Sequence, residues 1–290
     1  MDYDLQLHDF SSFFSLKGKV AVITGGSRGL GLSAASAILQ AGASKVYINS
    51  RKASVCDEAA AALNKLPGLA NGAKAISVPA DITSAAGLRQ LVEFVTKDSP
   101  DGIDILLANA GATWGAPLEE HSDAVIAKVL DLNVRAVFNT VRELAPALSR
   151  RGTLDDPSRI LVTASVAGLG VGAVGNQGTF GYSASKAAVI HLARNLAVDL
   201  GPRHITVNAI APGFFPTKMS RGLIEMAEGG MAGMAKRNPM QRLGKPEDFA
   251  GAVVYFCARA GSHVNGATLT IDGGAMWSTN QLSSGNKPRL

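Results

Sequence analysis

The chain has 290 residues, 47% of them apolar, which is enough for an extensive hydrophobic core in one large domain or two small ones. Its 28 basic and 23 acidic residues give a formal charge of +5 and are scattered without a basic run, so nucleic-acid binding is poorly supported. No apolar run approaches the roughly 20 residues of a membrane span, and the first residues are acidic where a signal peptide is basic, so we expect an intracellular, cytoplasmic protein without a membrane role.

Seven short apolar runs predict buried strands, because most of them lack the alternation of a strand with one solvated face. The runs cover residues 19–24, 45–50, 74–80, 103–109, 159–165, 204–211 and 267–271. Alanine-rich helical patterns lie between them, at residues 29–41, 53–66, 84–97, 122–148, 182–200 and 246–258. The alternation predicts one α/β domain, residues 17–276, with a doubly wound parallel sheet of about seven strands. An N-terminal arm, residues 1–16, would precede it, and a tail, residues 277–290, would follow it.

A glycine cluster, Thr24-Gly-Gly-Ser-Arg-Gly-Leu-Gly31, joins the first predicted strand to the first predicted helix. Its glycines permit a tight turn and let backbone N–H groups approach a pyrophosphate at a helix N-terminus. Glycines also make ordinary strand-to-helix turns, but this position and crowding favour a dinucleotide cofactor. The cofactor contacts that we expect from this loop are Gly25, Ser27, Arg28, Gly29, Leu30 and Gly31.

The end of the second predicted strand indicates which dinucleotide binds. An acidic residue there would accept a hydrogen bond from the ribose of NAD, but the chain has Asn49, Ser50 and Arg51 and no carboxylate before Asp57. Arg51, with Arg28, can hold a 2′-phosphate through charge-assisted hydrogen bonds, which favours NADP(H). Two arginines on a solvated surface are the alternative.

The long helix predicted from residue 182 opens within Phe180-Gly-Tyr-Ser-Ala-Ser-Lys186. Tyr182 and Lys186 lie one helical turn apart on the same face. A phenol beside an ammonium is a candidate proton donor, since the positive charge favours the phenolate and lowers a pKa of about 10. A surface tyrosine and lysine at helical spacing is the alternative.

Residues 214–240 break the alternating pattern. Methionines and glycines follow one another closely around residues 226–234, with no strand signal and weak helical periodicity. We expect a mobile substrate lid, because long loops in compact domains are usually functional and methionines adapt to irregular apolar ligands. A poorly ordered insertion is the alternative.

Over residues 17–274 the chain resembles the short-chain dehydrogenase/reductase family. The motifs that carry the resemblance, in family order and approximate spacing, are residues 24–31, Asp81-Ile82, Asn109-Ala110-Gly111, Asn133, Ser165, Tyr182 with Lys186, and Pro212-Gly213. Each motif alone is weak, and together they are specific. Within the family, residues 109–118, 212–219 and 242–248 look most similar to 3-oxoacyl reductases of the rhamnolipid type.

The resemblance implies a Rossmann-like fold with strand order 3-2-1-4-5-6-7 and a homo-oligomer, either a tetramer or a dimer. It also implies a catalytic set of Ser165, Tyr182, Lys186 and Asn133. Tyr182 would protonate the substrate oxygen as hydride arrives, while Ser165 bonds to that oxygen. Lys186 would hold the nicotinamide ribose and lower the pKa of Tyr182, and Asn133 would anchor a water that leads the proton inward.

The same resemblance implies the remaining cofactor contacts. Those at the adenine are Asp81 and Ile82, those on the cofactor floor are Asn109, Ala110 and Gly111, and those at the nicotinamide end are Pro212, Gly213, Phe215 and Thr217. Structural roles are the alternative for three of the motif residues: Asn133 can pin a helix, Ser165 can end a strand, and Asp81 can cap a helix.

Two departures from the family pattern concern the substrate. The interval from Ser165 to Tyr182 is a few residues longer than usual, and residues 166–179 are rich in glycine beside the expected pocket. Lys218 stands where many relatives have an acidic residue. The candidate pocket residues are Trp114, Phe214, Val166 and Gly175, with core packing as the alternative for the aromatic ones.

We therefore expect an NADPH-dependent reductase of a small-molecule ketone, most simply a 3-oxoacyl thioester, that uses no metal, because Cys56 and Cys257 lack metal-ligand spacing. A secondary-metabolite or polyketide ketone reductase, or a polyol or steroid-type alcohol dehydrogenase, is the alternative among enzymes. A noncatalytic NADPH-binding sensor is the alternative outside them. The final residues, Pro288-Arg289-Leu290, distantly resemble a peroxisomal address, which keeps a peroxisomal location open.

Overall fold

The computed structural model describes residues 9–278. A seven-stranded sheet forms its middle layer, and each neighbouring pair of strands is parallel, in the order β3-β2-β1-β4-β5-β6-β7. The strands are β1 (Val20–Thr24), β2 (Lys45–Ser50), β3 (Lys74–Pro79), β4 (Ile105–Ala108), β5 (Ser158–Thr163), β6 (Ile205–Pro212) and β7 (Thr268–Ile271). The predicted doubly wound sheet and its strand order are confirmed.

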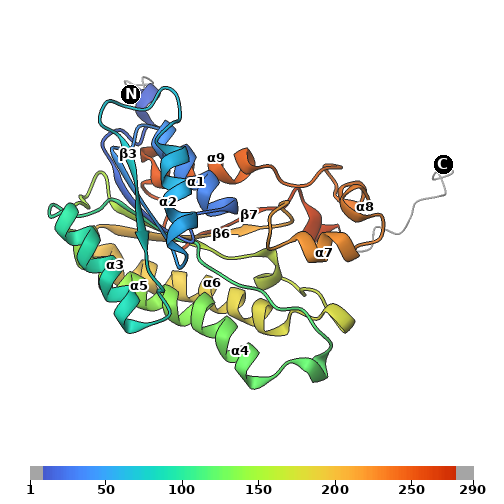
Figure 1. The fold of residues 1–290 in the computed structure, drawn as a ribbon. Coiled ribbons are helices and arrows are strands. Elements are labelled where there is room, and N and C mark those ends of the chain that lie inside the picture. The colour runs from blue at the N-terminus through green and yellow to red at the C-terminus, as the bar shows by residue number, and fades with distance from the viewer. Residues whose placement is uncertain (1–8, 279–290) are drawn as a thin grey trace, which may run out of the picture.

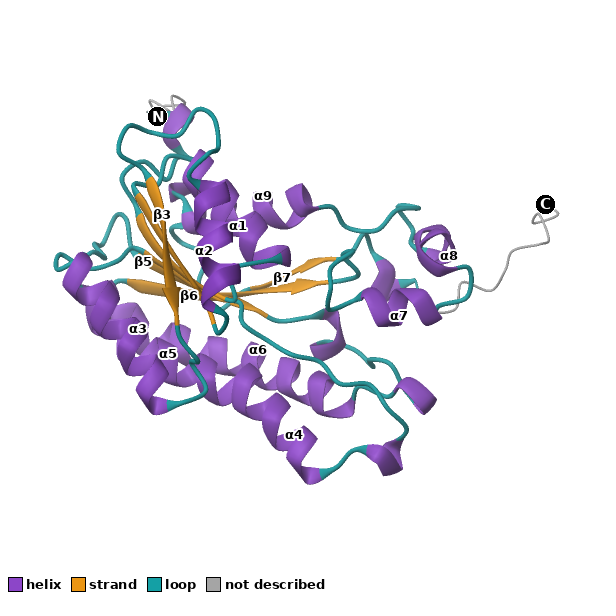
Figure 2. Ribbon diagram, viewed as in Figure 1, coloured by secondary structure: helices purple, strands orange, loops and turns teal. Residues whose placement is uncertain are grey.

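Helices cover both faces of the sheet (Figure 1 and Figure 2). One face carries α1 (Gly29–Gln40), α2 (Ala53–Leu63) and α9 (Pro246–Cys257). The other carries α3 (Ala85–Asp98), α5 (Ala136–Ser149) and α6 (Phe180–Leu200), with α4 (Asp123–Leu130) leading into α5. Two short helices, α7 (Arg221–Met226) and α8 (Gly230–Arg237), stand apart from these layers, beyond the ends of β6 and β7 (Figure 1).

The strands are mainly apolar and lack polar alternation because both faces of the sheet are covered. In β1, Val20 and Val22 pack into the core beneath α3, α5 and α6, while Ala21 and Ile23 pack into the core beneath α1, α2 and α9. Successive side chains of a strand point to opposite faces, so each residue of such a run removes apolar surface from water. Burial of one large aliphatic side chain contributes about 1.5–3 kcal/mol.

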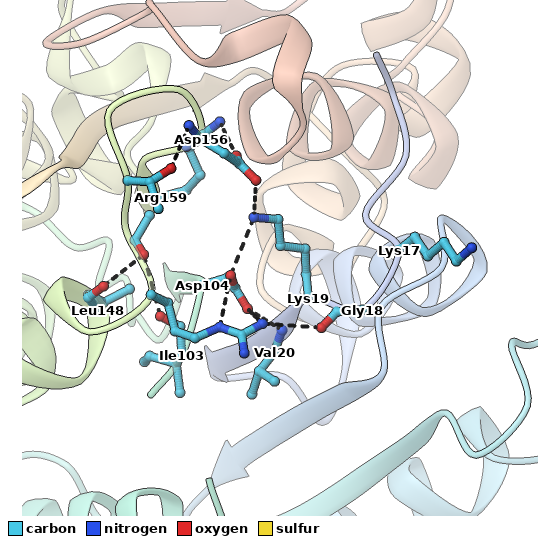
Figure 3. Close-up of polar contacts among 12 residues, drawn as sticks. Lys17, Gly18, Lys19, Val20, Ile103, Asp104, Leu148, Asp156 and Arg159 are labelled. Atoms are coloured by element: carbon cyan, nitrogen blue, oxygen red, sulfur yellow. Dashed lines mark hydrogen bonds and ion pairs between the residues drawn. The ribbon is translucent and has the colours of Figure 1, made fainter. Parts of the chain in front are cut away.

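Charged side chains join the amino ends of three strands, at the edge of the sheet where the strands begin (Figure 3). The Asp104 carboxylate accepts hydrogen bonds from the backbone N–H of Val20 at 2.8 Å and from the Lys19 ammonium at 3.3 Å, and pairs with Arg151 at 3.0 Å. Lys19 also pairs with Asp156, just before β5. The network fixes the starts of β1, β4 and β5 relative to one another.

Arg159 extends this network to the end of α9 (Figure 3). Its guanidinium is buried, pairs with Asp156 at 3.2 Å, and donates to the carbonyl oxygens of Phe256 and Ala258 at 3.2 Å each. A cation at a helix C-terminus satisfies carbonyls that the helix leaves unpaired and interacts favourably with the helix dipole. The two cysteines, Cys56 and Cys257, are buried free thiols on the same side of the sheet.

The structure departs from the expected elements in two places. The predicted helix 122–148 is interrupted by a π-helical turn, Asp131–Arg135, between α4 and α5. The predicted loop 214–240 contains the helices α7 and α8, which weak periodicity did not reveal. Its mobility stays a prediction.

The predicted terminal segments are described only in part. Residues 10–12 form a short 3-10 helix, and the carbonyl of Phe13 accepts the backbone N–H of Ala260 at 3.0 Å. Residues 1–8 and 279–290, with the final Pro-Arg-Leu, lie outside the described residues. Between residues 9 and 278, no helix has the length and apolar character needed to cross a membrane.

Candidate active site

The glycine loop connects the carboxyl end of β1 to the amino end of α1. Gly25 and Gly29 have φ angles of 65° and 54°, a region that other residues rarely adopt. A Cβ on Gly31 would lie 2.4 Å from the carbonyl oxygen of Gly25, so a side chain there would collide with the loop. Arg28, the N-cap residue of α1, makes no side-chain cap within the described structure, and the first turn of α1 has no acidic residue. Its N–H groups and helix dipole therefore suit a pyrophosphate.

Hydrogen bonds join this loop to β4 and β5. The Asn109 amide donates to the carbonyl oxygens of Thr24 and Gly25 at 3.2 Å each, and accepts a 3.1 Å hydrogen bond from the Thr163 hydroxyl. The Thr24 hydroxyl accepts the backbone N–H groups of Asn109 and Ala110, both at 3.1 Å. The Asn109 side chain thus holds the glycine loop against the carboxyl end of β5. Thr24 was expected only as the first residue of the glycine cluster, and Thr163 was not predicted; both are polar residues at the carboxyl ends of largely apolar strands.

Lys186 lies in the first turns of α6, and its side chain is buried, with 5% of the residue exposed. Its ammonium donates a 2.6 Å hydrogen bond to the carbonyl oxygen of Thr163 and lies 5.6 Å from the centre of the Tyr182 ring. Burial lowers the pKa of Lys186 from 10.5 to about 8, because desolvation disfavours the charged form. A Cβ on Gly111 would approach this ammonium to 3.5 Å, so the absence of a side chain there keeps room beside it.

Tyr182 and Ser165 lie beside each other at the carboxyl end of β5. Burial raises the pKa of Tyr182 above its usual value, while hydrogen bonding with Ser165 acts in the opposite direction. The Ser165 hydroxyl also accepts the backbone N–H of Ala167 at 3.2 Å, which caps a short 3-10 helix. The net pKa of Tyr182 is raised in this structure because desolvation dominates and the Lys186 ammonium donates to Thr163. The phenol is therefore protonated at neutral pH, as a proton donor requires. That Lys186 favours the phenolate stays a prediction.

Asn133 lies in the π-helical turn between α4 and α5, with 1% of the residue exposed. Its amide accepts the backbone N–H of Ala112 and donates to the carbonyl oxygen of the same residue, both at 2.9 Å. It also donates to the Ser185 hydroxyl at 2.9 Å, and that hydroxyl donates to the Tyr182 carbonyl at 2.6 Å. Asn133 thus joins the segment after β4 to the first turn of α6, and π-turns of this kind are frequent at functional sites. Ser185, adjacent to Lys186, was missed in the sequence analysis.

The predicted adenine end lies at the carboxyl ends of β1 and β2. These strands are neighbours, with Thr24 opposite Asn49, so the exposed Arg28 and Arg51 extend from adjacent strand ends. The Asn49 side chain itself is buried and donates to the carbonyl oxygens of residues 78 and 80, at 2.9 Å and 3.1 Å. It fixes the end of β2 to β3, whereas Ser50, the next residue, is half-buried at the strand end.

Asp81 follows β3 at the same edge. Partial burial by itself would raise the pKa of its carboxyl group. Hydrogen bonds from Thr83 and the charge of Arg51 together outweigh that effect, so the pKa is below its usual range. Ser84 caps α3, accepting the N–H of residue 87 at 3.0 Å, so the capping role considered for Asp81 belongs to Ser84. Ile82 is buried in the core against α3.

The segment after β6 reaches back over the glycine loop. Its start is fixed by Pro212 at the end of β6 and by Gly213, whose N–H donates to the carbonyl of Ile271 at 2.9 Å. The methyl group of Thr217 would lie 3.7 Å from a Cβ on Gly29, so this residue adjoins the predicted pyrophosphate site.

Phe215 occupies a different environment from the predicted cofactor contact. Its ring is buried in the core, with 4% of the residue exposed, and packs edge-on against Phe249 with ring centres 6.4 Å apart. The side chain therefore supports the loop from behind, and only backbone atoms of Phe215 remain for a ligand.

The candidate pocket residues come from three separate segments. Trp114, after β4, is 48% exposed, and Phe214, after β6, is 42% exposed, so neither is a core residue. Val166 begins the 3-10 helix next to Ser165, and Gly175 begins a second one, at a φ of 67°. Further exposed apolar side chains of these segments are Leu118, Leu169, Val171, Val174 and Met219.

Comparisons with known proteins show which proteins this chain is similar to. The chain matches the protein family described as enoyl-(acyl carrier protein) reductase over residues 25–276. It is 39% identical to the rhamnolipids biosynthesis 3-oxoacyl-(acyl-carrier-protein) reductase of Pseudomonas aeruginosa, over 90% of this chain and 98% of that protein. It is 35% identical to the 2-dehydro-3-deoxy-D-gluconate 5-dehydrogenase of Pseudoalteromonas atlantica, over 91% and 98%. Among solved structures, the Pseudomonas aeruginosa RhlG/NADP active-site complex matches with a TM-score of 0.82 at 38% identity, over 91% and 99%.

Proposed function

The chain belongs to the short-chain dehydrogenase/reductase family, and from this premise we propose that it uses NADPH to reduce a ketone to a secondary alcohol. The expected family, and its enzyme class of oxidoreductases acting on hydroxyl and keto groups, are thereby confirmed. The observation that carries the proposal is the buried Lys186 beside Tyr182, connected through Thr163 and Asn109 to an uncapped glycine loop. A surface tyrosine and lysine would not be held in this way.

The residues present fit nicotinamide adenine dinucleotide phosphate, NADP(H). Two exposed arginines, Arg28 and Arg51, extend from adjacent strand ends, and charge-assisted bonds from such a pair suit a 2′-phosphate. The similar Pseudomonas aeruginosa structure is a complex with NADP, which supports the same choice. The first N–H groups of α1 would hold the pyrophosphate, and Lys186 the nicotinamide ribose.

Proton transfer is assigned to the side chains around Tyr182. Bound NADPH supplies the hydride. Tyr182 Oη donates its proton to the substrate oxygen, and the Ser165 hydroxyl orients that oxygen by a hydrogen bond. Lys186 provides a positive charge that stabilises the phenolate left on Tyr182, and Asn133 holds the segment after β4 against α6.

The substrate that fits best is a 3-oxoacyl thioester. The segments that follow β4, β5 and β6 carry exposed apolar side chains, which suit an acyl chain better than a polyol. The similarity to a 3-oxoacyl reductase supports this choice, whereas the similarity to a gluconate-type dehydrogenase keeps a polar substrate as the second candidate. Exposed apolar residues of α5 and α6, Phe138 and Val198, support assembly into a homo-oligomer.

The test is product analysis with NADPH and a panel of 3-oxoacyl thioesters, polyol-derived ketones and cyclic ketones. We expect 3-oxoacyl thioesters to give the 3-hydroxy product with the highest kcat/KM. Preferred turnover of a polyol-derived ketone would assign the polar substrate. Tight NADPH binding without turnover of any ketone would overturn the enzyme assignment and favour a sensor.

A further inference from the structure

Residues 166–179, the glycine-rich segment between β5 and α6, are attached to the loop after β4. Ala116 and Gly178 form an isolated antiparallel bridge, in which the N–H of Ala116 donates to the carbonyl oxygen of Gly178 at 3.1 Å. Just before the bridge, a Cβ on Gly115 would approach the carbonyl oxygen of Gln177 to 3.2 Å. The glycine-rich segment and the loop after β4, which form two walls of the candidate pocket, are therefore in contact beside Trp114.

His121 holds the two sides of this bridge together. Its Nε2 atom lies 3.1 Å from the carbonyl oxygen of Ala116 and 3.0 Å from that of Gly178. Carbonyl oxygens only accept, so Nε2 carries the proton and donates to both. Its Nδ1 atom is buried and has no partner among the described residues. Burial of Nδ1 without a partner costs free energy and so does not hold the ring in place. The ring position is explained by the two contacts of Nε2.

The same ring reaches the start of the catalytic helix. His121 packs edge-on against Phe180, the first residue of α6, with ring centres 5.3 Å apart. Phe180 in turn lies where a Cβ on Gly178 would collide with its ring, at 2.3 Å, and Gly181 packs closely against Ile126 of α4. Phe180 precedes Tyr182 by less than one turn, so His121 contacts both pocket walls and the helix that carries the proton donor.

We infer that His121 is a positioning residue that sets the shape of the substrate pocket, and through it the selectivity for acyl-chain length. It acts by donating from Nε2 to the two carbonyl oxygens, which fixes residues 166–179 against the Trp114 loop. This inference rests on the proposed ketone reduction for its kinetic test, but the contact itself can be tested without any substrate.

The kinetic test compares two replacements. His121→Gln keeps an N–H donor that can serve both carbonyls, and His121→Phe keeps a ring for Phe180 but loses the donor. With NADPH, we expect His121→Phe to raise KM for 3-oxodecanoyl thioester about fivefold while kcat for 3-oxobutanoyl thioester changes by less than about twofold. His121→Gln is expected to stay within about twofold of wild type for both substrates. The exposed His263, replaced by phenylalanine, serves as the control.

Three kinetic outcomes would overturn the role. Wild-type behaviour of His121→Phe would show that the donor is unnecessary. Equal loss of kcat on both substrates, or equal damage in His121→Gln and His121→Phe, would show a general structural role. His121→Leu supplies a second donor-free variant if His121→Phe does not fold.

A fluorescence measurement tests the contact independently of turnover. The chain has two tryptophans, so Trp277→Phe leaves Trp114 as the only reporter. In that background we expect acrylamide quenching of Trp114 to increase about twofold with His121→Phe and to be unchanged with His121→Gln. Unchanged quenching in His121→Phe would overturn the inference. If wild type reduces no ketone but quenching responds as expected, the proposed function fails while the positioning contact stands.

Discussion

The ammonium of Lys186 donates a 2.6 Å hydrogen bond to the main-chain carbonyl oxygen of Thr163, the last residue of β5. The Thr163 hydroxyl donates to Asn109, which holds the glycine loop, so α6 and the predicted cofactor site are connected through the sheet. Burial is the only cause of the lowered pKa of Lys186, and no carboxylate among the described residues offsets it. A buried charge without an opposite charge lowers the free energy of unfolding, so we expect that Lys186 serves function rather than stability.

Replacement of Lys186 by methionine is expected to abolish activity and to raise the free energy of unfolding at pH 7 by about 1–3 kcal/mol. The pKa of Lys186 is lowered from 10.5 to about 8 in the folded chain. Between those pH values the unfolded chain binds more protons, so wild-type stability rises with pH and the advantage of the variant shrinks. Urea unfolding of both proteins at pH 7 and pH 10 measures this.

The exposed Lys65 provides the control, since Lys65→Met is expected to change stability by less than about 0.5 kcal/mol at either pH. A Lys186→Met protein that is less stable than wild type at pH 7, or a stability difference that does not narrow at pH 10, would contradict the burial argument.

Arg51→Asp is expected to lower the ratio of kcat/KM with NADPH to that with NADH by about 100-fold or more. The change removes a charge-assisted partner of the 2′-phosphate and adds a repelling carboxylate. Steady-state kinetics with both cofactors measures the ratio. Arg89→Asp, an exposed arginine of α3, should leave it unchanged. An unchanged ratio in Arg51→Asp would remove the basis for choosing NADP(H).

Arg159→Met is expected to lower the free energy of unfolding by about 2–4 kcal/mol, because it leaves the carbonyls of Phe256 and Ala258 without their donor and removes one of the two cations paired with Asp156. Arg142→Met, which removes an exposed ion pair, should cost less than about 1 kcal/mol. Chemical denaturation of both variants gives the comparison. Since Arg159 lies at the amino end of the sheet, KM for NADPH should not change. Equal losses in the two variants would contradict the role assigned to Arg159.

The sheet could be predicted from the sequence because strands covered on both faces, such as β1 and β6, are mainly apolar and lack polar alternation. The π-helical turn at Asn133 could not, since one extra residue in a helical turn leaves the apolar periodicity of residues 122–148 almost unchanged. The helices α7 and α8 are short and glycine-rich, so their periodicity is weak.

The candidate site could be predicted where motif residues point toward the site, as Tyr182 and Lys186 do. Motif position does not separate a side chain that faces a ligand from one that holds the backbone, which is why Asn49 and Phe215 turn out to be buried supports. The role of His121 depends on two carbonyl oxygens that are far apart in the sequence, and no local sequence pattern predicts such a contact.

The central claim is that Tyr182 donates the proton in NADPH-dependent ketone reduction, and one comparison tests it directly. NADPH oxidation with a 3-oxoacyl thioester is measured for wild type and for Tyr182→Phe, together with NADPH binding by fluorescence titration. We expect turnover to fall by about 10³-fold or more in Tyr182→Phe, with the Kd for NADPH within about threefold of wild type. Retained reduction by Tyr182→Phe at near wild-type rate would contradict the account.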